Sequence, residues 1–124
     1  MVIGIGVDII EVERIKGAIE RHGQRFLDRV YCPGEIRCCR SSANSFQRFA
    51  ARFAAKEAVL KALGVGWQDG TRFTDVEVVV NSKGRPSVKL SGKSRRIGEA
   101  LGVSRVHISL SHTKRHAIAQ AVAE

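Results

Sequence analysis

The stretch RFAAKEAVLKAL, from Arg52 to Leu63 and followed by Gly64, decides how this chain folds. Its large apolar residues and those of the preceding segment recur at helical spacing, and alanine fills most other positions. The pattern predicts one long helix that begins near Ser45 and is stopped by Gly64. The apolar residues that define this helix are Phe46, Phe49, Phe53, Leu60 and Leu63.

Glu57 is the unusual residue of this helix. At about 100° per residue it falls between Phe53 and Leu60, on the side expected to face the core. Because a carboxylate buried alone costs several kcal/mol, a cation should meet it. The candidates are Lys61 one turn later, a side chain from elsewhere, or a metal ion. Local sequence favours the salt bridge with Lys61.

Composition bounds the class of protein. A chain of 124 residues predicts a single domain over residues 1–124. No apolar run has the length of a membrane span and the opening residues lack a basic leader, so we expect a cytoplasmic protein with no membrane partner. Cys32, Cys38 and Cys39 form no C-x-x-C pair, and we expect reduced thiols.

The net charge of +9 predicts an anionic partner: nucleic acid, a phosphate-rich small molecule or an acidic protein. A nucleic-acid binder usually adds stacking aromatics to its basic face. Here Trp67 and Tyr31 are each the only residue of their type. A small basic nucleic-acid-binding module is therefore the alternative function, not the favoured one.

Asp8 admits two interpretations. The β-branched run Val2–Val7 predicts a buried strand that ends at Asp8. Gly4 and Gly6 lie inside that strand, which argues against a dinucleotide-binding loop. Glu11 follows Asp8 by three residues, so on local grounds Asp8 is the N-cap of the next helix, in an arrangement like a capping box.

The remaining pattern predicts an α+β fold, with one long central helix packed on a mostly antiparallel sheet. Arg14, Arg21 and Arg25 would share a basic surface on the first two short helices, which favours an acidic protein partner. The other predicted elements are helices 11–21, 24–30, a short one after Pro33 and 92–101, a hairpin of strands 74–80 and 85–90, and strands 103–111 and 117–122.

In this fold Asp8 at a strand end and Glu57 on the sheet-facing side of the helix could converge. Mg²⁺ typically takes one or two carboxylates and completes its shell with phosphate and water. The pair therefore makes a candidate Mg²⁺ site, and a Mg²⁺-dependent phosphohydrolase is a third hypothesis for the function.

Four motifs in order resemble those of the small bacterial phosphopantetheinyl transferases, the holo-acyl-carrier-protein synthases. They are Ile3–Asp8, the Arg52–Ala58 block with Lys61, Gly84-Arg85-Pro86, and Ser109–Thr113. The resemblance implies the 4′-phosphopantetheinyl transferase fold and a homotrimer with active sites between subunits. It also implies Mg²⁺-dependent transfer of 4′-phosphopantetheine from coenzyme A to a serine of apo acyl carrier protein, rather than a nucleic-acid partner.

The resemblance also assigns residues. Asp8 and Glu57 would be catalytic Mg²⁺ ligands, and Lys61 would contact the coenzyme A pyrophosphate. Proton removal from the serine is left to the glutamate or to a metal-bound water. The expected coenzyme A contacts are Arg48, Arg52, Lys61, Lys83, Gly84, Arg85, Pro86, His112 and Thr113, and the expected carrier-docking residues are Arg14, Arg21 and Arg25.

One departure from the family pattern concerns the segment before the long helix. Family members often carry basic residues there that help to hold the 3′-phosphate, whereas this chain has Ala43-Asn44-Ser45. Arg40 and Arg48 are the nearest candidates to replace them.

Overall fold

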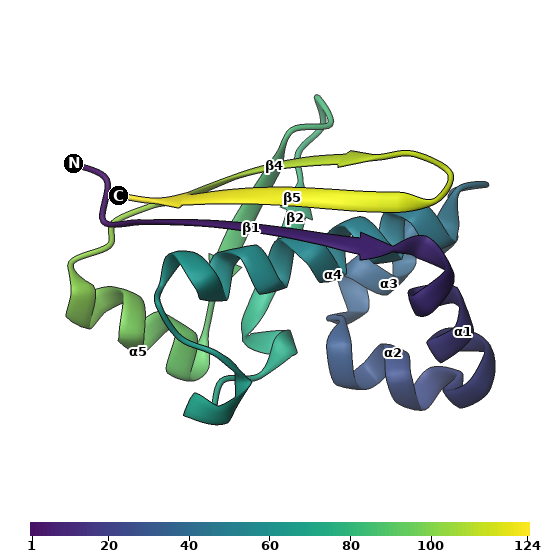
Figure 1. Cartoon of the computed structure of the whole chain (residues 1–124), viewed down its shortest axis with the longest axis horizontal. Helices are drawn as coiled ribbons and strands as arrows, with labels where there is room; N and C mark the ends of the chain where they lie inside the picture. The colour runs from purple at the N-terminus through teal and green to yellow at the C-terminus, as the bar shows by residue number, and fades with distance from the viewer.

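The long helix is present as α4, Ser45–Ala62, and the other elements pack around it in a computed structural model that describes residues 1–124 (Figure 1). Gly64 adopts φ +74, a backbone conformation that residues with a side chain rarely take. This glycine ends the helix as the sequence predicts.

The elements follow the predicted order. The helices are α1 (Val12–His22), α2 (Gln24–Val30), α3 (Pro33–Arg40) and α5 (Gly92–Leu101), and the strands are β1 (Gly4–Glu11), β2 (Val76–Val80), β3 (Pro86–Leu90), β4 (Val106–His112) and β5 (His116–Ala123). Short 3-10 turns occupy Trp67–Asp69 and Phe73–Asp75 between α4 and β2.

Two antiparallel sheets flank α4. Strands β1, β5 and β4 form a three-stranded sheet in that order, and β2 pairs with β3 as the predicted hairpin. Helices α1, α2 and α3 gather near the N-terminal end of α4, while α5 lies near its C-terminal end (Figure 1). The predicted α+β fold with a central helix is therefore confirmed.

A seam of small residues lets α4 lie directly against the three-stranded sheet. A Cβ added to Gly4 or Gly6 of β1 would lie only 1.9 Å from a backbone carbonyl oxygen of α4, on Ala62 and Ala58 respectively. The residues of β5 that face the helix are all alanines and all buried: Ala117, Ala119, Ala121 and Ala123. The two glycines of β1 thus serve close packing of helix on sheet.

The prediction that the first strand ends at Asp8 is wrong. Pairing with β5 continues to Glu11, which lies opposite His116, so Asp8 is an interior residue of β1 opposite Ala119. Glu11 is the N-cap residue of α1, and no side-chain hydrogen bond caps this helix. The capping role proposed for Asp8 is also wrong, because the strand carries Asp8 past the start of the helix. With a period of two, Asp8 shares the helix-facing side of β1 with Gly4 and Gly6.

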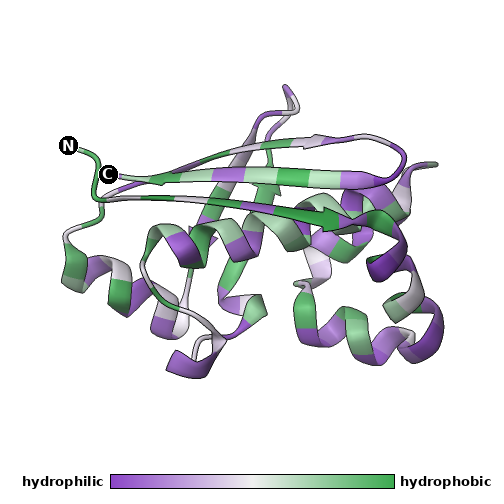
Figure 2. Cartoon of the chain, viewed as in Figure 1, coloured by the Kyte–Doolittle hydropathy of each residue, from purple (hydrophilic) through white to green (hydrophobic).

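The opposite side of the three-stranded sheet, here called the outer sheet face, is apolar and exposed. Its large residues are between 42% and 67% exposed, and hydrophobic residues recur along β1 and β5 in Figure 2. The residues concerned are Ile5, Val7, Ile9 and Ile118.

The charged pair at the centre of the core was not predicted. Lys56 and Glu35 have no exposed side-chain surface, and the Lys56 Nζ lies 2.8 Å from Glu35 Oε1. The same Nζ donates to the carbonyl oxygens of Phe73, at 3.0 Å, and Val76. The pair therefore joins α3 and α4 to the start of β2.

The cysteines are free thiols. Burial raises the pKa of both Cys32 and Cys39 to about 11, so these two thiols are neutral near pH 7. None of the helices combines the length and the apolar character that crossing a bilayer requires.

The small-residue seam predicts different outcomes for two Gly→Ala substitutions. Gly6→Ala should lower the free energy of unfolding by about 3 kcal/mol, since the new methyl group would overlap the Ala58 carbonyl oxygen. Gly17→Ala is the control. There the new Cβ meets only the flexible Arg21 guanidinium, at 3.2 Å, and helix propensity should add about 0.5–1 kcal/mol of stability. Urea unfolding measures the free energy of unfolding of both variants. Equal changes in the two would contradict the close packing of α4 on β1.

Candidate active site

Asp8 and Lys61 meet at the free edge of β1. The Lys61 Nζ donates to Asp8 Oδ1 at 3.2 Å and to the Val7 carbonyl oxygen at 2.9 Å. The Lys61 side chain is 54% exposed and that of Asp8 is 19% exposed. The predicted salt bridge between Lys61 and Glu57 is wrong, because the two oxygens of β1 take the ammonium group instead.

Glu57 is half-buried at the margin of the core rather than inside it. Its Oε1 accepts a hydrogen bond from the Trp67 indole Nε1 at 3.0 Å, and Oε2 has no hydrogen bond within the chain. Residues four apart on a helix share a face, so Glu57 lies beside the Lys61 side chain that holds Asp8. Asp8, Glu57 and Lys61 are called the carboxylate cluster below.

The basic residues of α1 border the same side of the molecule. Phe53, one turn before Glu57, lines a cavity of about 450 Å³ together with Arg14 and Arg21. The rest of its lining is Ile10, Ile15, Ala18 and Phe26, which are apolar, and Glu11 and Glu13. Arg25 is exposed on α2 and does not line this cavity.

Arg48 and Arg52 lie on another side of α4. Arg48 precedes Glu57 by nine residues, which corresponds to about half a rotation around the helix. Arg52 is 4% exposed, and its Nη2 lies 3.3 Å from Cys38 Sγ on α3. The Arg52 Nε is buried without a hydrogen-bond partner. These two cations thus point away from the carboxylate cluster.

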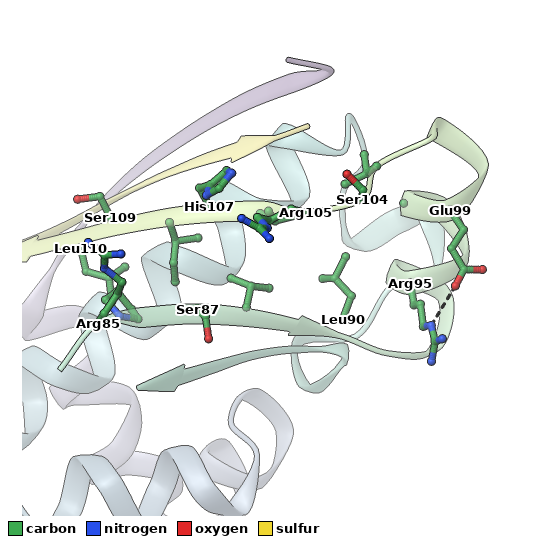
Figure 3. A pocket seen from close by; sticks show the side chains of 16 residues that line it. Arg85, Ser87, Leu90, Arg95, Glu99, Ser104, Arg105, His107, Ser109 and Leu110 are labelled. Carbon is green, nitrogen blue, oxygen red and sulfur yellow. Dashed lines mark hydrogen bonds and ion pairs between the residues drawn. The ribbon is translucent and has the colours of Figure 1, made fainter. Parts of the chain in front are cut away.

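The turn between β2 and β3 is fixed by its own residues. Asn81 Oδ1 accepts from the backbone N–H groups of Lys83 and Arg85, each at 2.9 Å, and Gly84 adopts φ +78. Arg85 and Pro86 then line a cavity of about 1040 Å³ between β3, β4 and α5. Figure 3 shows Arg85 beside Leu110, between β3 and β4.

His112 is the exposed last residue of β4, at the start of the turn into β5. The Thr113 hydroxyl oxygen accepts from the backbone N–H groups of Arg115 and His116, at 3.2 and 3.1 Å, and so shapes this turn. Because β5 separates β4 from β1, His112 and Asp8 belong to opposite edges of the sheet.

The predicted site residues therefore fall into two groups within one chain. The carboxylate cluster lies at the β1 edge with Arg14 and Arg21 nearby. The second group, here called the basic half, lies toward the β4 edge and the far side of α4; it comprises Arg48, Arg52, Lys83, Gly84, Arg85, Pro86, His112 and Thr113. Trp67 had no predicted role, since a single tryptophan in a glycine-punctuated loop gives no signal of its partner.

Comparisons with known proteins agree over the whole chain. The family model of the 4′-phosphopantetheinyl transferase superfamily matches residues 4–121. Holo-[acyl-carrier-protein] synthases of Koribacter versatilis and Solibacter usitatus are 48% and 46% identical over 124 residues, which are 100% of this chain and 99% of each relative.

Solved structures give the same result. The holo-[acyl-carrier-protein] synthase of Neisseria meningitidis superposes with a TM-score of 0.90 at 32% identity, covering 100% of this chain and 99% of that one. The Helicobacter pylori enzyme, solved in complex with coenzyme A, has a TM-score of 0.86 at 32% identity, with 97% and 99% covered. On this evidence the chain belongs to the 4′-phosphopantetheinyl transferase superfamily and, within it, to the holo-[acyl-carrier-protein] synthases.

Proposed function

We propose that this protein transfers the 4′-phosphopantetheine group of coenzyme A to a serine of apo acyl carrier protein and releases adenosine 3′,5′-bisphosphate. The observation that carries the proposal is the carboxylate cluster at the β1 edge, in a chain that matches this family of transferases over its full length. The free thiols fit a reducing compartment, and we place the reaction in the cytoplasm.

Mg²⁺ is the cofactor that the donor set fits best. Asp8 and Glu57 offer oxygen ligands, the Oε2 of Glu57 is free of hydrogen bonds, and both side chains retain access to solvent. The chain gathers no cluster of three or more His, Cys, Asp or Glu side chains, and Mg²⁺ often takes only one or two carboxylates together with phosphate. When bound, the ion would neutralise charge on the phosphate oxygens.

Lys61 supplies the fixed positive charge of the reaction. The serine hydroxyl gives its proton to Glu57 or to a water molecule as its oxygen forms a bond to the β-phosphorus of coenzyme A. The bond from that phosphorus to the bridging oxygen breaks, leaving its electron pair on adenosine 3′,5′-bisphosphate. The Lys61 ammonium is half exposed and is held at Asp8. It would stabilise the negative charge on the departing phosphate.

A complete site would need two copies of the chain. Within one chain the basic half lies away from the carboxylate cluster, whereas coenzyme A must reach both if all predicted contacts are made. We propose that copies associate through the outer sheet face, as a homotrimer, so that the basic half of one copy faces the carboxylate cluster of the next. Large apolar side chains exposed together on one sheet face are typical of an interface.

Arg14 and Arg21 would receive the carrier protein. They line a cavity together with Phe53, which lies one turn before Glu57 on α4. An acidic protein bound there would present its serine beside the cluster. Arg25 extends the same basic surface onto α2. The high net charge of +9 favours such a partner.

Glu57→Gln tests the cofactor assignment. Transfer to an apo carrier protein, followed by mass spectrometry across a Mg²⁺ series, should fall by at least about 100-fold, since an amide binds the cation poorly. Circular dichroism should show a folded protein. Asp28→Asn, which alters an exposed carboxylate on α2, is the matched control and should keep full activity. Normal turnover of Glu57→Gln at limiting Mg²⁺, or hydrolysis of coenzyme A without a carrier, would contradict the proposal.

Arg14→Glu tests carrier docking. Charge reversal should raise the KM for the carrier protein by about tenfold and leave the KM for coenzyme A unchanged, because only the acidic partner faces this residue. Arg37→Glu removes the same charge from α3, where it is exposed but outside the basic surface, and should change neither constant. Steady-state kinetics with each substrate varied in turn makes the measurement. Equal losses for both substrates would argue against a separate docking surface.

Ile9→Lys tests the assembly. A charge on the outer sheet face, where Ile9 lies opposite Ile118, should convert a trimer into monomers, read by light scattering, and should abolish most transfer activity. Glu20→Lys places the same residue on the exposed surface of α1 and should leave the mass in solution unchanged. An active monomeric Ile9→Lys protein would show that one chain holds a complete site.

A further inference from the structure

We infer that Trp67 is a positioning residue that holds the Glu57 carboxylate in the orientation needed for metal binding. The inference rests on the proposed function and adds a residue to it. Trp67 Nε1 donates to Glu57 Oε1 at 3.0 Å, which is the only hydrogen bond of that carboxylate within the chain. The bond occupies one oxygen and leaves Oε2 available to a cation.

The indole ring is held in place by a row of aromatic rings. Trp67 stacks on Phe73 with ring centroids 3.5 Å apart and planes inclined by 29°. Phe73 stacks in turn on Phe53, with centroids 5.2 Å apart. Phe53 lies one turn before Glu57 on α4. The row therefore contacts one face of α4 at both ends: through the bond of Trp67 to Glu57 at one end and through Phe53 at the other.

The loop that carries Trp67 is fixed by its own hydrogen bonds. Asp69 Oδ2 accepts from the Gly66 N–H at 2.8 Å, and the buried Thr71 hydroxyl donates to the Gly66 carbonyl oxygen at 3.0 Å. Further along, the Phe73 carbonyl oxygen accepts from the buried Lys56 Nζ. The core thus anchors the ring on which Trp67 stacks.

The indole is a neutral donor. Its N–H fixes one oxygen of Glu57 and brings no positive charge to that carboxylate, so it can orient the metal ligand as the hydrogen-bond partners of metal ligands do. The chain directs Lys61 to Asp8 and Val7 instead. Glu57 therefore has one neutral hydrogen-bond partner and no ion pair within the chain.

Trp67→Phe separates the hydrogen bond from the packing, because phenylalanine keeps an aromatic ring on Phe73 but has no N–H. Two quantities are measured: the Mg²⁺ concentration that gives half-maximal transfer, and Mg²⁺ affinity in the presence of coenzyme A by calorimetry. Both should weaken by about tenfold, the loss expected when a group that orients a metal ligand is removed. The KM for coenzyme A at saturating Mg²⁺ should stay near the wild-type value.

Tyr31→Phe is the matched control. It removes another aromatic donor, the Tyr31 hydroxyl that bonds the Phe49 carbonyl oxygen at 2.7 Å in the core. This variant should lose stability in urea and keep wild-type Mg²⁺ dependence. Trp67→Leu, which removes stacking as well as the donor, should weaken Mg²⁺ binding at least as much as Trp67→Phe.

The possible results distinguish the positioning role of Trp67 from the proposed transferase activity. If wild type is active and Trp67→Phe stays within about twofold of it in both Mg²⁺ measurements, the positioning role is overturned and the transferase stands. The same follows if Trp67→Phe changes only stability, as Tyr31→Phe should. A wild-type protein that is inactive with Mg²⁺, coenzyme A and several carrier proteins would remove the proposed function and the inference together.

Discussion

The buried pair of Lys56 and Glu35 is the interaction on which the rest of the structure depends. Neither side chain reaches solvent, so each charge relies on the other and on backbone groups for compensation. Glu35 accepts from the N–H groups of Cys32 and Val78, while Lys56 donates to two carbonyl oxygens near the start of β2. Loss of one partner from such a pair typically costs about 3–5 kcal/mol, because it leaves a buried charge unpaired. The pair therefore fixes the rotation of α4 relative to α3 and β2.

That rotation determines where the functional residues face. Glu57 follows Lys56 directly, so it is turned about 100° away and emerges at the margin of the core. The small-residue seam determines how close α4 lies to β1. Because Gly6 lets the backbone of α4 touch β1, Lys61 can reach the Val7 carbonyl oxygen and Asp8. One buried ion pair and two glycines in a strand thus bring a lysine and two carboxylates to the same edge of the sheet.

The sequence predicted the elements whose signals are local. Helix α2 and helix α5 begin and end where their periodicity and flanking glycines indicate, and α4 begins at the expected residue. The errors concern residues whose partners are distant along the chain. The nearby Glu11 predicts a helix cap at Asp8, whereas the strand of Asp8 continues through pairing with β5. Lys56 pairs with Glu35, which lies 21 positions away. Trp67 bonds to Glu57 on another element, and the sequence of its own loop does not indicate this partner. Periodicity alone could therefore find neither contact.

The division of the predicted site follows from the use of one helix for two purposes. Helix α4 presents Glu57 and Lys61 on one face. It presents Arg48 and Arg52 on another, so it cannot direct both sets at one small molecule. Packing copies through the outer sheet face would resolve this, yet each chain carries a net charge of +9, and like charges oppose association. In the proposed trimer, coenzyme A would place its phosphates between the basic half of one copy and Lys61 of the next, and their negative charge would offset part of that repulsion. A ligand that binds only the assembled form also stabilises it by mass action. Substrate binding and assembly would then support each other, and the apolar face need only supply the part of the association energy that the phosphates do not.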